Sequence, residues 1–375
     1  MVGFLPILDV PYMNPIDRTA IEQALSSYQD PYLKTDLLTA GCLRSLDIDG
    51  DRVSASLRLN YAAGRIVGGI GQMLTVALEN VPGVESARVQ VDWEVRPAPT
   101  QGNIPGLANV KNIIAVASGK GGVGKSTTSV NLALALAGEG ARVGVLDADI
   151  YGPSMGLMLG VPAGTRPGVK EEKWFVPPRA HGVQVMTMAF LADDKTPMAW
   201  RGPMASGALL QLLTQTAWDD LDYLIVDMPP GTGDLQLTLA QKAPVTGSVI
   251  VTTPQDIALL DARKGIEMFR KVNIPVLGVV ENMAVHICSN CGHAEHLFGE
   301  GGGVRLADEY GVELLGSMPL SMTIREQADG GRPTVIAEPE SQLSLLYQDM
   351  ARHLAARVSA LAAGGAAPVI SISDD

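Results

Sequence analysis

The hydrophobic residues follow two different patterns, and the change between them divides the chain near residue 100. In the first part, RVSASLRLNY and ARVQVDWEV alternate apolar and polar side chains, as strands with one buried face do. Helices are predicted over AIEQALSSY, with Asp17 as the N-cap, and over residues 66–80. Residues 14–96 are therefore expected to form a small α+β domain. Cys42 is expected to be one of its core residues.

The segment PAPTQGNIPGLAN, residues 97–109, interrupts the periodic pattern. It is rich in Pro, Gly and Asn and carries no charge. Such a composition is typical of a connection between domains, so this segment is predicted to be a linker.

From residue 110 onward, short β-branched apolar runs alternate with helical patterns such as STTSVNLALALAGEG and DARKGIEMFRKV. Several runs are apolar on both faces, which is typical of parallel strands buried between helices. The pattern predicts a doubly wound, mostly parallel α/β domain over residues 110–361, with a last helix over 341–361 and a disordered tail over 362–375. The predicted strands are 112–118, 142–149, 183–188, 223–228, 247–253, 276–282 and 314–319.

Composition narrows the range of partners. Hydrophobic residues make up 46% of the 375 residues, which is ample material for the cores of more than one domain. The 40 acidic and 28 basic side chains leave a net charge of −12, so neither nucleic acid nor a membrane surface is an expected partner. No apolar run approaches the length of a spanning helix, and the start lacks a basic segment typical of a secretion signal. With only three Cys, a disulfide scaffold is not indicated, and we expect a cytoplasmic protein.

The strongest chemical signal is a phosphate-binding loop. The sequence fits G-x-x-x-x-G-K-[ST] directly after a predicted strand and directly before a predicted helix, which is the context of a P-loop. Backbone N–H groups of such a loop surround a β-phosphate, and Lys125 is expected to neutralise phosphate charge while the Ser126 hydroxyl ligates Mg²⁺. The predicted nucleotide-binding residues are Gly119, Lys120, Gly121, Gly122, Val123, Gly124, Lys125, Ser126 and Thr127.

Further polar residues follow other predicted strands. Asp147 and Asp149 close one strand, and Asp227 closes another, where carboxylates can hold Mg²⁺ through water and position an attacking water. Asn282 ends a later predicted strand.

Cys288 and Cys291 form a C-x-x-C pair in a loop rich in Gly, Asn and Ser. The pair suits a soft metal or half of an iron–sulfur cluster, and a redox role is an alternative. A zinc site would recruit His293 and His296, but their spacing is shorter than zinc sites usually show.

The number of Cys residues bears on the oligomeric state of the protein. An all-thiolate [4Fe–4S] cluster needs four Cys, whereas this chain has three and Cys42 lies in the other domain. Two copies of the Cys288 and Cys291 pair across a two-fold axis supply four, which predicts a homodimer.

SGKGGVGKST resembles the deviant phosphate loop of the ATPase family that includes the nitrogenase iron protein, MinD and ParA. In that family the extra lysine, here Lys120, reaches the partner's nucleotide. The resemblance implies that Asp149 is the aspartate that orients water and that Asp227 is the Walker B-type aspartate. It places Asn282 where these ATPases read adenine. A side-chain amide can both donate to and accept from an adenine edge, so the resemblance implies ATP as the nucleotide.

The chain from about 110 to 340 is similar to the Mrp/ApbC branch, whose members carry iron–sulfur clusters. VLDADIYGPSM, LIVDMPPGTGD, TTPQDIALLDARKGIEMF, CSNCGHAEHLFGEGGG and IREQADGGRP carry this resemblance. The first domain resembles the MIP18-like domain often fused in front of bacterial Mrp proteins. The implied function is an ATPase that binds a [4Fe–4S] cluster and transfers it to apo iron–sulfur proteins. The alternatives are a positioning ATPase like MinD or ParA, and a zinc-stabilised regulatory P-loop ATPase.

Overall fold

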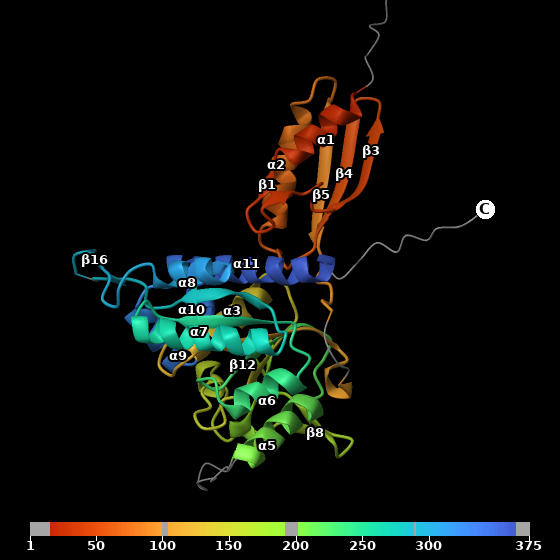
Figure 1. Cartoon of the computed structure of the whole chain (residues 1–375). Coiled ribbons are helices and arrows are strands. Elements are labelled where there is room, and N and C mark those ends of the chain that lie inside the picture. Colours follow the sequence, from red (N-terminus) through yellow and green to blue (C-terminus); the bar gives the residue numbers. More distant parts are fainter. Residues whose placement is uncertain (1–15, 100–103, 192–201, 289, 365–375) are drawn as a thin grey trace, which may run out of the picture. The chain divides into compact units, whose positions relative to one another are not determined.

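The computed structural model describes residues 16–99, 104–191, 202–288 and 290–364. The chain divides into two compact units, one ending at Glu94 and one beginning at Val95 (Figure 1).

The first unit is a small sheet with helices on one side. Strand β4 pairs antiparallel with β3 and parallel with β5, and α2 packs against β5. Both predicted helices are present, and the Asp17 carboxylate caps α1 by accepting from Thr19 N at 2.9 Å. Cys42 is fully buried. The elements are α1 (Arg18–Ser26), β1 (Gln29–Asp30), β2 (Thr35–Asp36), β3 (Leu43–Asp49), β4 (Arg52–Leu59), α2 (Val67–Glu79) and β5 (Ser86–Trp93).

The second unit is built on an eight-stranded sheet of order β10-β11-β7-β12-β6-β13-β14-β17. All pairings are parallel except that of the edge strand β10. Each of the seven predicted apolar runs forms a strand, so the predicted fold class is confirmed. These strands are β6 (Val110–Ala117), β7 (Val143–Asp147), β11 (Val183–Thr187), β12 (Leu221–Asp227), β13 (Gly247–Thr252), β14 (Val276–Glu281) and β17 (Leu314–Ser317).

Helices cover both faces of this sheet (Figure 1). Helix α3 packs against α11 on one face, and α7 packs against α8 on the other, as expected when right-handed connections run in both directions from β6. The helices are α3 (Lys125–Gly138), α4 (Met155–Met158), α5 (Gly202–Gln215), α6 (Asp234–Lys242), α7 (Asp256–Lys271), α8 (Gly302–Tyr310), α9 (Met322–Asp329), α10 (Thr334–Ala337) and α11 (Gln342–Gly364).

The sequence pattern missed several short elements. These are the edge strand β10 (Arg179–Ala180), the hairpins β8 (Gly168–Lys170) with β9 (Trp174–Val176) and β15 (His286–Ile287) with β16 (Ala294–Glu295), and the 3-10 turns η1 (Pro105–Leu107) and η2 (Met188–Phe190). Helix α11 runs to Gly364, so the first residues of the predicted tail are helical.

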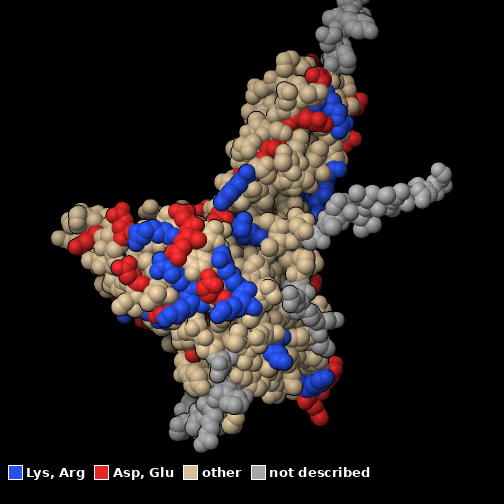
Figure 2. Space-filling model, in the orientation of Figure 1, with Lys and Arg blue, Asp and Glu red and all other residues tan. Residues whose placement is uncertain are grey.

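Two surface features bear on function. Among the described residues, no helix is long and apolar enough to cross a bilayer. On the face shown in Figure 2, basic side chains are interspersed with acidic ones. One ion pair of the second unit joins Arg263 of α7 to Glu309 of α8.

Candidate nucleotide and thiol site

The predicted phosphate loop connects the end of β6 to the start of α3. Gly124 is the N-cap of α3 with φ +80°, a left-handed conformation that favours glycine. Gly119 has no room for a side chain, because an added Cβ would lie 2.2 Å from the backbone of Asp261 in α7. The glycines thus let the loop curve over the start of α3, where helix N–H groups and the helix dipole favour an anion.

Lys125 and Asp227 form a buried ion pair beneath this loop, with Nζ 2.6 Å from Oδ2. The Ser126 hydroxyl donates to the same carboxylate oxygen at 2.6 Å, and the Ser129 hydroxyl donates to Oδ1 at 2.6 Å. Sequence reasoning did not select Ser129, although its place four residues after Lys125 puts it on the same side of α3. The structure therefore brings together Lys125, Ser126 and Asp227, three of the predicted residues.

Asp147 ends β7 directly beside Asp227 at the end of β12. Its buried carboxylate accepts hydrogen bonds from the backbone N–H groups of Asp149, Ser154 and Met155 at 2.9–3.1 Å. Burial and, next, the charge of Asp227 raise the pKa of Asp147 to about 7. Asp147 therefore holds the loop that carries Asp149, a role that its sequence position did not reveal.

Asp149 faces the phosphate loop across a cavity of about 210 Å³. The lining also includes Ser154, Met158 and Pro230, together with loop glycines, Lys125, Ser126 and Thr127. A hydroxyl, a lysine and a carboxylate around one cavity are the groups that phosphoryl chemistry requires.

Lys120 lies at the edge of this arrangement. Its side chain is half-buried, and Nζ donates to Gln255 Oε1 of the same chain at 3.3 Å. Gln255 is the N-cap residue of α7.

Asn282 lies behind the phosphate loop. Its Nδ2 donates to Val123 O at 2.9 Å, and a Cβ on Gly124 would lie 2.1 Å from the same nitrogen. The cavity lining in the described residues does not include Asn282. The structure thus joins Asn282 to the loop backbone, a contact that the sequence did not indicate.

Cys288 and Cys291 lie at the tip of the β15–β16 hairpin. Cys288 N donates to His293 O at 2.9 Å and Gly292 N donates to Cys288 O at 2.8 Å, which closes a tight turn around the pair. The Cys288 thiol accepts from the backbone N–H groups of Asn290 and Cys291 and from the Cys291 thiol, and these hydrogen bonds lower its pKa. Cys291 is exposed and Cys288 is half-exposed. The turn therefore presents two thiols toward solvent, and the thiol of Cys288 has enhanced thiolate character.

The described residues around the pair do not form a complete metal site. Within the described ranges, no three His, Cys, Asp or Glu side chains are grouped so that they could hold a metal ion. His296 Nδ1 is instead 2.9 Å from the carbonyl oxygen of Ala284.

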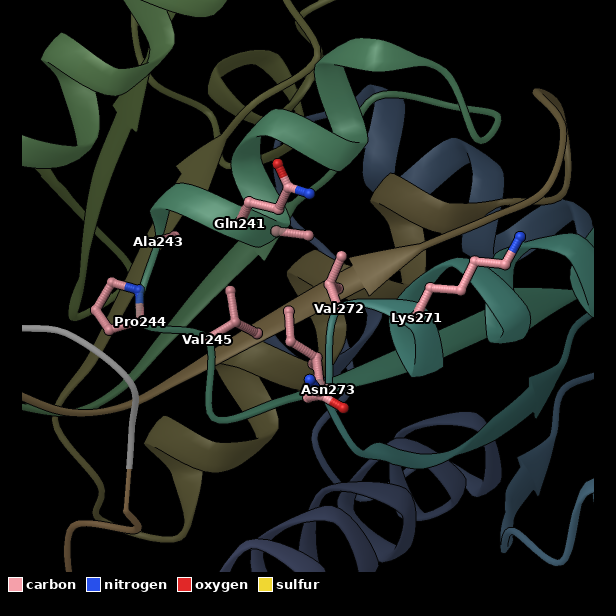
Figure 3. Close-up of a pocket in the computed structure, with 9 residues that line it drawn as sticks. Gln241, Ala243, Pro244, Val245, Lys271, Val272 and Asn273 are labelled. Atoms are coloured by element: carbon pink, nitrogen blue, oxygen red, sulfur yellow. The ribbon is translucent and has the colours of Figure 1, made fainter.

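A second pocket of about 210 Å³ lies between the α6–β13 and α7–β14 turns (Figure 3). Both turns precede parallel strands, so this pocket lies at the amino end of the sheet, opposite the phosphate loop. Its lining includes Gln241, Lys271 and Asn273 but no cysteine, histidine or carboxylate. This pocket has a lysine but neither the hydroxyl nor the carboxylate of the candidate site.

Comparison with known proteins gives two family matches. Residues 109–355 match the ParA family profile described as NUBPL iron-transfer P-loop NTPase. Residues 18–91 match the profile described as iron–sulfur cluster assembly protein.

Individual relatives agree with these matches. The chain is 74% identical over 279 residues to the iron–sulfur cluster carrier protein of Pseudomonas fragi, covering 74% of this chain and 97% of the relative. It is 49% identical over 341 residues to the carrier protein of Escherichia coli K12, covering 91% and 92%. A solved structure of an Archaeoglobus fulgidus nucleotide-binding protein in complex with ADP is 39% identical, with a TM-score of 0.55, covering 63% of this chain and 92% of that one.

Proposed function

The chain belongs to the NUBPL iron-transfer P-loop NTPase family and is an iron–sulfur cluster carrier P-loop NTPase. From that premise we propose that it hydrolyses ATP and that, as a homodimer, it holds a [4Fe–4S] cluster for transfer to apo-proteins. The observation that carries this proposal is the thiol pair on the β15–β16 hairpin, in a P-loop domain that supplies only half of a cluster's ligands.

The cluster is the cargo in this account, and Cys288 and Cys291 are its ligands. A [4Fe–4S] cluster takes four thiolates, and Cys42 is fully buried in the other unit. Two hairpins from two chains supply four exposed or half-exposed thiols. The N–H groups that lower the pKa of Cys288 also favour the thiolate form that binds iron.

Apolar side chains around the site support association with a second copy. Seven large apolar residues in segments that follow the carboxyl ends of β7, β13, β14 and β17 are each at least 50% exposed. Exposed apolar surface gathered at one edge of a domain marks an interaction site. These residues are Tyr151, Leu157, Ile257, Leu260, Ile287, Leu297 and Met322.

The cavity at the phosphate loop supports the ATPase half of the proposal. Ser126 and Asp227 place a hydroxyl and a carboxylate oxygen 2.6 Å apart, which are the hard oxygen donors that Mg²⁺ prefers. Bound Mg²⁺ neutralises charge on the phosphates. Lys125 then exchanges Asp227 for phosphate oxygens, and Asp149, across the cavity, orients the attacking water.

Lys120 has a different role in this proposal. Its bond to Gln255 places the ammonium group at the start of α7, where Ile257 and Leu260 are exposed. A partner that covers this surface lies within reach of a flexible lysine side chain. We assign Lys120 to the nucleotide of the partner, and Asn282 to the adenine ring.

The proposal is tested by anaerobic reconstitution followed by iron, sulfide and zinc analysis. The wild type should bind about two Fe per chain with matching sulfide, which is half of a four-iron cluster. Cys288→Ala and Cys291→Ala should each abolish loading, whereas the control Cys42→Ala should leave it intact. The loaded protein should also restore an apo-protein that requires a [4Fe–4S] cluster. Zinc without labile sulfide, or unchanged iron in the Cys288→Ala variant, would contradict the proposal.

A further inference from the structure

The segment from Glu281 to Ala284 touches both candidate sites. It leaves the end of β14 beside the phosphate loop and leads into the hairpin that bears Cys288 and Cys291. We propose that this segment is a mechanical link between the phosphate loop and the cysteine hairpin, and that His296 is the positioning residue that attaches the hairpin to it. This inference rests on the proposed function, because it describes how nucleotide state reaches the thiols.

The first attachment is to the phosphate loop. Asn282 is buried, and its Nδ2 donates to Val123 O at 2.9 Å. Because Gly124 has no side chain, the Asn282 amide sits directly against the loop backbone. An Asn amide carries two N–H donors and a carbonyl oxygen, and this bond uses one of the donors. A change in the loop around Val123, or a purine that contacts the same amide, therefore acts directly on Asn282.

The link itself is held firmly. Asn282 N donates to Thr252 O at 2.7 Å, and Ala284 N donates to Met318 O at 2.9 Å. Between them, Met283 adopts φ +58°, a left-handed conformation that is uncommon for a residue with a side chain. A segment fixed by hydrogen bonds on both sides of an unusual backbone conformation transmits a displacement instead of absorbing it.

The second attachment is to the cysteine hairpin. His296 immediately follows β16, and its Nδ1 lies 2.9 Å from Ala284 O. A carbonyl oxygen only accepts, so this contact requires the proton on Nδ1. Ala284 precedes the hairpin and His296 follows it, so this bond joins the two ends of the hairpin next to the β15–β16 ladder, in which His286 pairs with Glu295.

A third attachment fixes the chain beyond the hairpin. The buried Glu281 carboxylate accepts from Gly303 N at 2.7 Å in the first turn of α8. The Ser317 hydroxyl donates to its other oxygen at 3.2 Å. The segment from the hairpin to α8 is thus bound at two points to the neighbours of Asn282: His296 contacts Ala284, and Gly303 contacts Glu281.

The test measures thiol reactivity in the cluster-free protein, so it does not depend on cluster loading. The alkylation rate of the exposed thiols is compared with and without ATP and Mg²⁺, and Cys42 is protected by full burial. In the wild type, nucleotide should change this rate. In His296→Ala, the effect of nucleotide should shrink by roughly 2- to 10-fold, the worth of one hydrogen bond, while ATP turnover stays at the wild-type rate.

Two variants separate the link from a general loosening of the hairpin. His296→Asn keeps an N–H donor at the distance of Nδ1 and should restore the nucleotide effect. His293→Ala is the matched control, because His293 belongs to the same hairpin and gives its backbone carbonyl to the turn. In His293→Ala, nucleotide should change the alkylation rate of the thiols as much as it does in the wild type.

The outcomes distinguish this inference from the proposed function. An equal nucleotide effect in His296→Ala and in the wild type would overturn the link, even if the cluster is bound and transferred. The link would also be overturned if nucleotide did not change the alkylation rate of the thiols in the wild type. A nucleotide effect that depends on His296, in a protein that never loads a cluster, would support the link and refute the proposed function.

Discussion

Lys125 Nζ lies 2.6 Å from Asp227 Oδ2, in an ion pair that joins the start of α3 to the end of β12. The exposed fraction of the lysine side chain is 6% and that of the aspartate is 0%, so both charges are removed from water. Removing one member of such a pair leaves the other charge buried and uncompensated. The pair thus fixes the phosphate loop and holds its lysine at the cavity that Asp149 also lines.

We expect Lys125→Ala to lower ATP turnover by orders of magnitude, because the variant lacks the cation that faces the phosphates. Steady-state phosphate release measures this. Lys111→Ala is the matched control, because Lys111 also pairs with an aspartate, Asp222 at 2.9 Å, near the opposite ends of β6 and β12. Turnover that is normal in Lys125→Ala, or equally lost in Lys111→Ala, would refute the site assignment.

Asp147 should make stability depend on pH. Burial and, next, the charge of Asp227 raise its pKa to about 7, so the native state holds this proton more tightly than the unfolded chain does. A carboxyl with a raised native pKa favours folding at acid pH, and this contribution is lost as pH rises from about 4 to about 7. Asp147→Asn cannot ionise. The free energy of unfolding of Asp147→Asn minus that of the wild type should therefore increase with pH, by up to about 1.4 kcal/mol per pH unit between about pH 4 and about pH 7.

Urea titrations of both proteins at several pH values measure this difference, and contributions of other groups cancel in the comparison. A difference that stays constant from about pH 4 to about pH 7 would show that the pKa of Asp147 is not raised in the native state.

Much of the fold followed from the sequence, because fully buried parallel strands require continuous apolar runs, as in YLIVDM at the end of β12. The strands β8, β10, β15 and β16 have only two or three residues and are largely exposed, so no periodic pattern marks them. The P-loop motif likewise located Lys125 and Ser126. The contact of Asn282 with Val123 joins residues far apart in the sequence, and that of His296 with Ala284 joins two residues of irregular segments. The spacing of residues along the sequence predicts neither contact.

The Arg352–Glu139 pair should contribute strongly to stability. Glu139 caps the end of α3 and is fully buried, and Arg352 of α11 reaches it at 2.6 Å. Arg352→Ala should lower the free energy of unfolding by about 3–5 kcal/mol, because a carboxylate is left buried without its cation. Chemical denaturation measures this. Arg357→Ala on the same helix is the control and should cost about 0–1 kcal/mol, since that side chain is 45% exposed and lies 3.7 Å from Glu313.

Mixing two inactive variants tests the proposed role of Lys120. If Lys125 serves its own nucleotide and Lys120 serves that of the partner, Lys120→Ala and Lys125→Ala homodimers each have two defective sites. In a mixed dimer, the Lys120→Ala chain keeps its own Lys125 and receives Lys120 from its neighbour. Mixing should then restore up to about half of wild-type turnover per dimer, diluted by homodimers.

Differently tagged subunits must show independently that mixed dimers form. If they form and activity stays at the level of the parents, Lys120 acts only within its own chain, as its bond to Gln255 allows.

The most direct measurement of the central claim is the mass of the reconstituted protein under anaerobic, non-denaturing conditions. Our account predicts that the cluster occurs only on a species of two chains, with one [4Fe–4S] unit shared between them, because each chain supplies two accessible thiols. Cys288→Ala should remove both the cluster and the mass increment. A cluster carried by a single chain, or zinc in place of iron and sulfide on the dimer, would contradict the account.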